Sequence, residues 1–146
     1  MKKEETFDFH IKSCWHSISR MYNQQAAKEE ITASMGYVLI NIHSKEGTPA
    51  TKIAPMLGLE PRSLTRVLKA MEEKRLVERK PDPGDRRSVR IFLTEEGKLK
   101  KTKAIETVMD FNLSVKEALT EEEALSFFTI FQKINEVILQ NQKPEI

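Results

Sequence analysis

The sequence has 146 residues, with 24 lysines and arginines against 22 aspartates and glutamates, a hydrophobic fraction of 39% and a single cysteine, Cys14. These values predict one compact domain and exclude a disulfide framework, a Cys-x-x-Cys redox pair and an ordinary zinc finger. No run approaches the roughly eighteen apolar residues of a membrane span, and no apolar signal core follows the charged N-terminus. We therefore expect a cytoplasmic protein with no membrane partner.

Two helices are expected before residue 47. Apolar residues recur every three or four positions from residue 7 to about residue 29, which predicts one long amphipathic helix. A second helix should begin near Ser34, taken as its N-cap residue, and should end before Gly47.

A third helix is expected directly after Gly47. Thr48 should be its N-cap with Pro49 at the first helical position, and Gly58 should end it. Pro55 lies inside this helix, where a proline removes one backbone hydrogen bond at a cost of roughly 3 kcal/mol. We therefore expect the helix to be short or bent.

A fourth helix followed by a β-hairpin is expected next. The helix should open at Pro61. Beyond Leu76, an extended run, a turn-rich segment at residues 81–85 and an alternating run at residues 88–93 predict two paired strands with one buried face.

Two long helices should complete the chain. Thr94 is expected to cap a helix that runs to about residue 117, and Thr120 to cap a last helix that ends near Asn141. The last six residues should form a frayed tail. The predicted fold class is mainly α with a small β-hairpin wing (α+β), with long helices at both ends.

The fourth helix carries a basic face opposite its apolar face. On a helical wheel the apolar residues lie on one side, and Arg62, Arg66 and Lys69 lie on the other. Ser63 and Thr65 flank that basic face near the N-terminus of the helix. With the shorter helix before it, this arrangement is typical of a helix-turn-helix that places its second helix in the major groove of DNA. The alternative is a solvated surface with three ordinary cations.

The hairpin adds further cations beside that helix. They surround its Pro/Gly-rich tip: Arg79, Lys80, Arg86, Arg87 and Arg90. Arginines on a narrow projecting loop suit the minor groove, so we predict wing contacts to DNA from Arg86, Arg87 and Arg90. Asp85 should instead fix the tip by accepting hydrogen bonds from the turn amides or from Arg87.

Three motifs in this region occur in the order and spacing of one family. They are Leu-Val-x-Arg at residues 76–79, Asp-x-Arg at residues 85–87 and Leu-Thr-x-x-Gly at residues 93–97. With the flanking helices, the stretch from about residue 47 to residue 97 resembles the MarR family of winged helix-turn-helix transcriptional regulators.

The resemblance implies an organisation and a function. It implies a winged lobe at about residues 34–94 and a dimerisation region formed by residues 1–33 and 95–146. It further implies a homodimer that binds a pseudo-palindromic operator in double-stranded DNA, as a repressor. Many members of the family lose DNA affinity when a small phenolic or lipophilic effector binds between these regions. Trp15, Tyr22, Tyr37 and His43 are our candidates for contacting such an effector.

Arg75 departs from the family pattern, which usually has glycine at the end of the recognition helix. A left-handed cap there would cost a non-glycine residue of the order of 1 kcal/mol. The Arg75 side chain could also add a phosphate contact.

The dimer prediction has support from the residues themselves. Apolar stripes run along the last two helices: Ala104, Val108, Phe111 and Val115; Ile105, Met109 and Leu113; and Leu125, Phe128, Phe131, Ile134 and Ile138. These stripes offer more apolar surface than a small winged lobe can cover. The alternative is a monomeric helical core.

Other functions have less support in the sequence. Cys14 in the first helix is the basis of an alternative in which the regulator senses oxidants, although no cation is spaced to activate it. A protein-binding winged helix would need an apolar face on the fourth helix, where this chain has a basic one. No nucleophile elbow, phosphate loop, metal-ligand cluster or acid/base pair is present, so we expect no enzyme, no cofactor and no metal.

The near-neutral total charge hides an uneven distribution. Residues 61–90 contain ten lysines and arginines and five aspartates and glutamates, a net charge of +5, so the other 116 residues carry −3. The predicted DNA-reading segment is therefore basic and the rest of the chain is mildly acidic.

Overall fold

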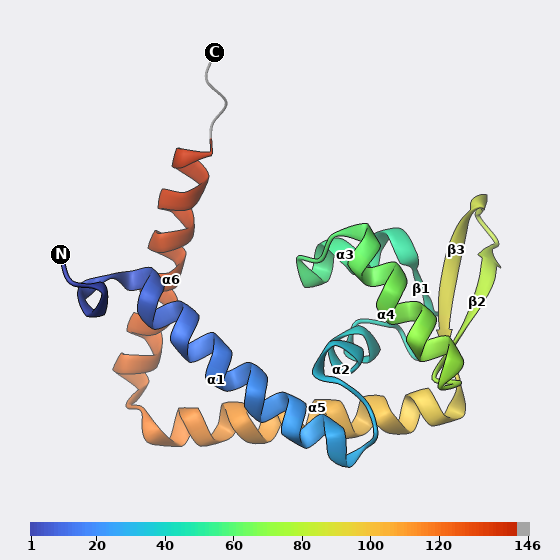
Figure 1. The fold of residues 1–146 in the computed structure, drawn as a ribbon, viewed down its shortest axis with the longest axis horizontal. Coiled ribbons are helices and arrows are strands. Elements are labelled where there is room, and N and C mark those ends of the chain that lie inside the picture. Colours follow the sequence, from blue (N-terminus) through green and yellow to red (C-terminus); the bar gives the residue numbers. More distant parts are fainter. Residues whose placement is uncertain (143–146) are drawn as a thin grey trace. The chain divides into compact units, whose positions relative to one another are not determined.

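The computed structural model describes residues 1–142, and these form two compact units (Figure 1). The first unit is Met1–Thr107 and the second is Val108–Ile146. Residues 143–146, which belong to the predicted dimerisation region and to the predicted frayed tail, lie outside the described residues.

The first unit begins with one turn of 3-10 helix, Lys3–Glu5, and the long helix α1, Phe7–Lys28. This confirms the first predicted helix. α1 ends with Glu30 in the left-handed conformation (φ 59°), and the amide of Ile31 donates to the carbonyl of Ala26 at 3.1 Å. This is a Schellman cap, in which the residue after the helix closes the last turn.

Helix α2, Ala33–Ile40, begins slightly earlier than predicted, because Thr32 and not Ser34 is its N-cap. The Thr32 hydroxyl accepts from the amide of Met35 at 3.2 Å. α2 buries Met35, Val38 and Leu39, and both threonine and serine are residue types that can cap a helix.

The predicted N-cap of the third helix was wrong. Thr48 and Pro49 form a short strand, β1, and α3 runs over Ala50–Leu57. Thr48 is buried, and its hydroxyl accepts from the amide of His43 at 2.9 Å, so it holds the loop before the strand and does not cap the helix. The end of α3 is as predicted, since Gly58 is left-handed (φ 62°), and the helix is short around Pro55.

The predicted fourth helix and hairpin are confirmed, and the hairpin gains a third strand. α4 is Pro61–Glu73, with the proline in its first turn. β2, Val77–Asp82, pairs antiparallel with β3, Asp85–Leu93, and β1 pairs with the other edge of β3, which gives the order β1-β3-β2.

The core of the first unit lies where α2, α3 and α4 pack against the base of this sheet (Figure 1). Its fully buried side chains come from each of these elements and from the loop after α2: Val38, Leu39, Ile42, Ile53, Met71 and Ile91. The hairpin tip projects beyond the core, because only the base of β3 is buried.

Two long helices follow with the predicted caps. α5 is Glu95–Ala118, and the amide of Gly97 donates to the Thr94 hydroxyl at 3.0 Å. α6 is Glu121–Asn141, and Thr120 and Glu123 form a reciprocal capping box. The backbone amide and hydroxyl of Thr120 lower the pKa of the Glu123 carboxyl. Among residues 1–142, no helix is long and apolar enough to cross a membrane.

Candidate nucleic-acid interface

α4 exposes each of its five side chains that we predict to contact DNA. Leu64 and Leu68 face the core and are 4% and 2% exposed. The polar residues of the opposite face are exposed: Arg62, Ser63, Thr65, Arg66 and Lys69. The Thr65 hydroxyl donates to the carbonyl of Pro61 at 2.9 Å, so part of its hydrogen-bonding capacity is used within the helix. The basic face is exposed to solvent because the opposite, apolar face of the helix packs in the core.

The turn between α3 and α4 is built by a glycine. The amide of Leu59 donates to the carbonyl of Ala54 at 3.0 Å, and Gly58 takes the left-handed conformation that this cap requires. Only three residues separate α3 from α4, so the two helices form a helix-turn-helix with α4 as the second member.

The C-terminal end of α4 has a left-handed cap at Arg75. Its φ is 57°, and its amide donates to the carbonyl of Glu72 at 2.9 Å. The amide of Leu76 donates to the carbonyl of Met71, also at 2.9 Å. This Schellman cap, like that of α1, is therefore made by a residue that is not glycine.

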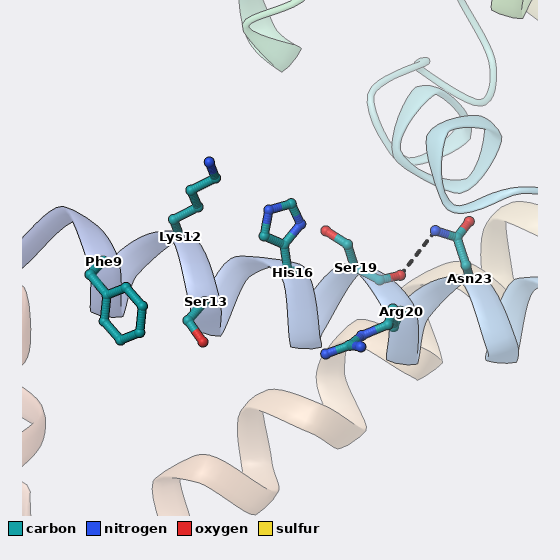
Figure 2. A pocket seen from close by; sticks show the side chains of 7 residues that line it. All are labelled: Phe9, Lys12, Ser13, His16, Ser19, Arg20 and Asn23. Carbon is teal, nitrogen blue, oxygen red and sulfur yellow. Dashed lines mark hydrogen bonds between the residues drawn. The ribbon is translucent and has the colours of Figure 1, made fainter. Parts of the chain in front are cut away.

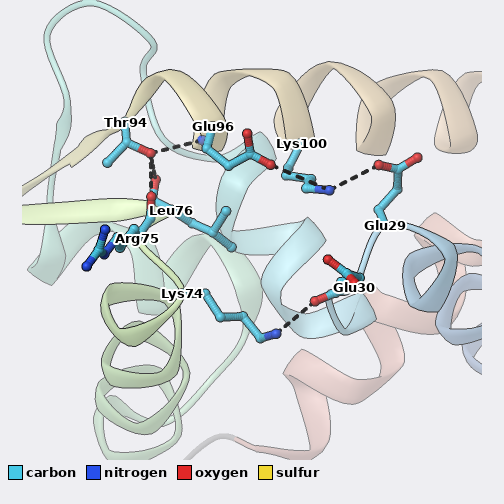
Figure 3. A network of polar contacts seen from close by, with 9 residues as sticks. Glu29, Glu30, Lys74, Arg75, Leu76, Thr94, Glu96 and Lys100 are labelled. Carbon is cyan, nitrogen blue, oxygen red and sulfur yellow. Dashed lines mark hydrogen bonds and ion pairs between the residues drawn. The ribbon is translucent and has the colours of Figure 1, made fainter.

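A polar network holds this end of α4 to α5 and to the end of α1 (Figure 3). The Thr94 hydroxyl donates to the carbonyl of Arg75 at 2.7 Å, and the Lys74 ammonium donates to the carbonyl of Glu30 at 2.9 Å. On the other side, the Lys100 ammonium lies 3.3 Å from a carboxylate oxygen of Glu29. The base of the candidate recognition helix is thus fixed to both neighbouring helices.

The wing tip is ordered by Asp85. One of its carboxylate oxygens accepts from the amide of Arg87 at 3.0 Å, and the other accepts from the hydroxyl of Ser88 at 3.1 Å. The side chains of Arg86 and Arg87 are exposed beside it. Asp85 therefore contacts the turn amide, as expected, and its contact with Arg87 is to the backbone and not to the guanidinium.

Three other cations of the hairpin are engaged within the protein. The Arg79 guanidinium lies 3.0 Å from Glu72 of α4, and the Lys80 ammonium lies 5.1 Å from the centre of the Phe92 ring. Arg90 is the most constrained of them, because it donates to two backbone carbonyls and pairs with a carboxylate. All three arginines were predicted to contact DNA. Arg90 is held by contacts within the protein, whereas the side chains of Arg86 and Arg87 are exposed.

Three of the four predicted effector residues come together. The rings of Tyr22 and Tyr37 are 6.0 Å apart in an edge-to-face arrangement, and the Trp15 ring is 6.4 Å from that of Tyr37. Desolvation raises the pKa of both tyrosines, and for Tyr37 the neighbouring Tyr22 contributes as well. The Nδ1 atom of His43 accepts from the amides of Lys45 and Glu46 in the loop after α2.

An open hollow of about 630 Å³ along α1 was missed by the sequence analysis (Figure 2). Three of its lining residues, Lys12, His16 and Arg20, recur every fourth position, and this basic stripe was the signal available in the sequence. The other lining residues are Phe9, Ser13, Ser19 and Asn23. Cys14, on the same helix, is exposed in the single chain.

Large apolar side chains are exposed in each unit. On α1 they are Phe7, Ile11 and Trp15. On α5 and α6 they include Ile105, Met109, Leu113, Val115, Leu125, Phe127, Phe128, Ile130, Val137, Ile138 and Leu139. α6 buries none of its residues in the single chain. So many exposed apolar side chains indicate an interface.

Comparison with known proteins gives the same family as the motifs. The MarR family model matches residues 31–89. The chain is 33% identical to the organic hydroperoxide resistance transcriptional regulator of Bacillus subtilis (strain 168) over 106 residues, which cover 73% of this chain and 72% of that protein. It is 40% identical over 68 residues to the HTH-type regulator YhbI of the same organism, covering 47% of this chain but only 44% of YhbI.

Solved structures share the fold. A MepR–DNA complex from S. aureus has a TM-score of 0.84 at 22% identity, over 90% of this chain and 98% of that chain. A mutant of MarR from E. coli, in complex with operator DNA, has a TM-score of 0.74 at 26% identity, over 85% and 89% of the two chains. The chain belongs to the MarR family of winged helix-turn-helix transcriptional regulators.

Proposed function

We propose that this protein represses transcription by binding a pseudo-palindromic operator in double-stranded DNA as a homodimer. α4 enters the major groove with Arg62, Arg66 and Lys69, and the wing enters the minor groove with Arg86 and Arg87. The observation that carries this proposal is the exposed basic face of α4 beside an ordered wing tip with two exposed arginines.

The charges of this surface are available to a ligand. Among residues 1–142, none of its five cations pairs with a described carboxylate: Arg62, Arg66, Lys69, Arg86 and Arg87. A duplex would supply phosphates for these groups, and releasing its condensed counterions would drive binding. Ser63 and Thr65 stand at the N-terminal end of α4, where a recognition helix contacts base edges.

The homodimer is supported by the exposed apolar residues of α1, α5 and α6. A symmetric dimer would bury them and would carry two basic surfaces. Two reading helices about 34 Å apart, or a multiple of that distance, would match half-sites on one face of the duplex.

Fluorescence anisotropy tests the proposal directly. The labelled duplexes are those tiled from DNA upstream of the protein's own gene, and one enriched from a random library by the wild-type protein. We expect tight binding to the enriched duplex, with an affinity that falls about a thousandfold or more between 50 and 200 mM salt. Undetectable or salt-insensitive binding would refute it.

Two substitutions distinguish the loss of a groove contact from the loss of one positive charge anywhere on the protein. Arg66→Ala should weaken binding by about 1–3 kcal/mol if it contacts a base, and Arg87→Ala should weaken it through the minor groove. Lys28→Ala removes an exposed cation at the end of α1 and serves as the control. Equal effects of all three variants would contradict the assigned surfaces.

We further propose that a phenolic or lipophilic effector binds beside α1 and lowers DNA affinity. The aromatic cluster of Trp15, Tyr22 and Tyr37 would suit an aromatic ring, and the cations Lys12 and Arg20, which line the hollow on α1, would attract an acidic group. Trp15 is the one tryptophan of the chain, so its fluorescence reports binding without a label. Salicylate is expected to quench this emission in the wild-type protein, with a weaker effect after Lys12→Ala. Unchanged emission up to millimolar salicylate would count against this site for aromatic acids.

A further inference from the structure

Arg90 connects the wing to the helix-turn-helix. It lies on β3, and its Nη1 donates to the carbonyls of Glu46 at 3.0 Å and of Gly47 at 3.2 Å. Its Nε lies 3.5 Å from a carboxylate oxygen of Asp82 on β2. The Arg90 side chain is only 25% exposed, so these contacts are partly shielded from water.

The segment that Arg90 reaches leads directly to α3. Glu46 and Gly47 precede β1, and α3 begins after Pro49. Gly47 (φ 67°) lies so close to β3 that a Cβ there would come within 2.6 Å of the Ile91 carbonyl and 2.9 Å of the Phe92 ring. Arg90 therefore reinforces a close contact between the wing strand and the segment that positions α3.

Asp82 extends the connection to the tip of the wing. Its side chain is 12% exposed, and its Oδ1 accepts from the amide of Gly84 at 2.9 Å, while Oδ2 faces Arg90. The strand register shifts between Pro81 and Asp82, so the regular pairing of β2 with β3 is interrupted at this residue. One carboxylate thus contacts both the turn at the wing tip and the guanidinium of Arg90.

We propose that Arg90 and Asp82 are positioning residues, which set the angle of the wing against the helix-turn-helix and act on DNA only through Arg86 and Arg87. We call Arg90, Asp82 and the carbonyls of Glu46 and Gly47 the wing lock. This inference rests on the proposed function, and it reassigns Arg90 from a DNA contact to a residue that orients the contacts.

Asp82→Asn distinguishes positioning from direct contact by the sign of its effect. Removing an anion near DNA should strengthen binding if charge alone matters. Asparagine keeps an oxygen that can accept from Gly84 but lacks the charge that pairs with Arg90. The wing lock therefore predicts that Asp82→Asn weakens binding to the enriched duplex by about fivefold or more, which is about 1 kcal/mol.

Arg90→Lys provides a second variant that keeps the charge. A lysine would serve as well for a phosphate contact, but one ammonium cannot make the forked set of contacts seen for Arg90. We expect Arg90→Lys to lose as much affinity as Arg90→Gln. An affinity of Arg90→Lys equal to that of the wild type would overturn the proposal.

A mutant cycle in which both wing arginines are replaced, Arg86→Ala with Arg87→Ala, excludes a general loss of folding. If Asp82 acts through the wing arginines, Asp82→Asn should change affinity by less than about twofold once Arg86 and Arg87 are both absent. The same loss in both backgrounds, or tighter binding by Asp82→Asn, would refute the wing lock while leaving the proposed function intact. A wild-type protein that enriches no duplex would overturn both.

Discussion

Gly97 lies very close to the backbone at the C-terminal end of α4. It lies in the first turn of α5, where a Cβ would collide with the carbonyl oxygen of Leu76. That carbonyl already accepts from the amide of Thr94 at 3.1 Å, so it cannot move away without losing a hydrogen bond. The glycine of the Leu-Thr-x-x-Gly motif is therefore required by a close backbone approach.

Gly97→Ala should destabilise the protein by about 3 kcal/mol, because the collision is with backbone and not with a flexible side chain. Gly36→Ala is the matched control, since a Cβ at Gly36 would lie 3.7 Å from that of Ala104, an ordinary contact. Urea unfolding at fixed protein concentration measures both variants. An equal midpoint for Gly97→Ala and the wild type would contradict the packing argument.

At the scale of the elements, three helices end in the same way with different residues. α1, α3 and α4 each close with a left-handed residue, and these are Glu30, Gly58 and Arg75. Only the second is free of the steric penalty that a side chain meets at positive φ. The two other caps persist because neighbouring contacts fix them, as the Thr94 hydroxyl does at Arg75.

Arg75→Gly should therefore raise the free energy of unfolding by about 1 kcal/mol. Arg75→Ala removes the same guanidinium but keeps a Cβ at positive φ, so it should give no such gain. Chemical denaturation of the two variants at equal concentration checks this prediction. Equal stability of the glycine and alanine variants would show that the left-handed cap carries no measurable strain.

Local signals predicted most of the elements. The period of α1, the proline that opens α4, the turn residues of the hairpin and the threonines before α5 and α6 all act within a few residues, and each prediction was confirmed. Thr48 was assigned wrongly because its strand pairing with Ile91 joins residues far apart in the sequence. A Thr-Pro pair gives the same local signal for the start of a helix whether or not it also pairs with a distant strand.

The candidate site, like the elements, could be predicted only where its residues lie close together in the sequence. The exposed face of α4 follows from periodicity within thirteen residues, so Arg62, Arg66 and Lys69 could be grouped from the sequence. The contacts of Arg90 span 43 and 44 residues, and no local pattern distinguishes this arginine from Arg86 and Arg87. The basic stripe on α1 was visible in the sequence, but nothing in its spacing said that it lines a hollow.

At the scale of the whole molecule, charge and apolar surface are separated along the chain. The net charge of +5 lies in residues 61–90, whereas most of the exposed large apolar side chains lie on α1, α5 and α6. This separation would leave one surface for the proposed second copy and another for DNA.

Phe128→Glu tests the association. Phe128 is 67% exposed on α6, so the substitution should not disturb the core of the first unit. Light scattering should give twice the 16.9 kDa chain mass for the wild type and a single chain mass for Phe128→Glu. Thr129→Glu adds the same charge on the polar side of α6 and should remain dimeric. A dimeric Phe128→Glu would exclude Phe128 from the interface.

The contacts around Thr94 also bear on the order in which the chain folds. Its hydroxyl bonds to Arg75 and Leu76 close loops of 19 and 18 residues, whereas Lys100 reaches Glu29 and Lys101 reaches the Ile42 carbonyl across 71 and 59 residues. Shorter loops close at a lower cost in entropy. α4, the wing and the start of α5 can therefore assemble as a local unit, whereas the end of α1 completes its contacts only with residues much later in the chain.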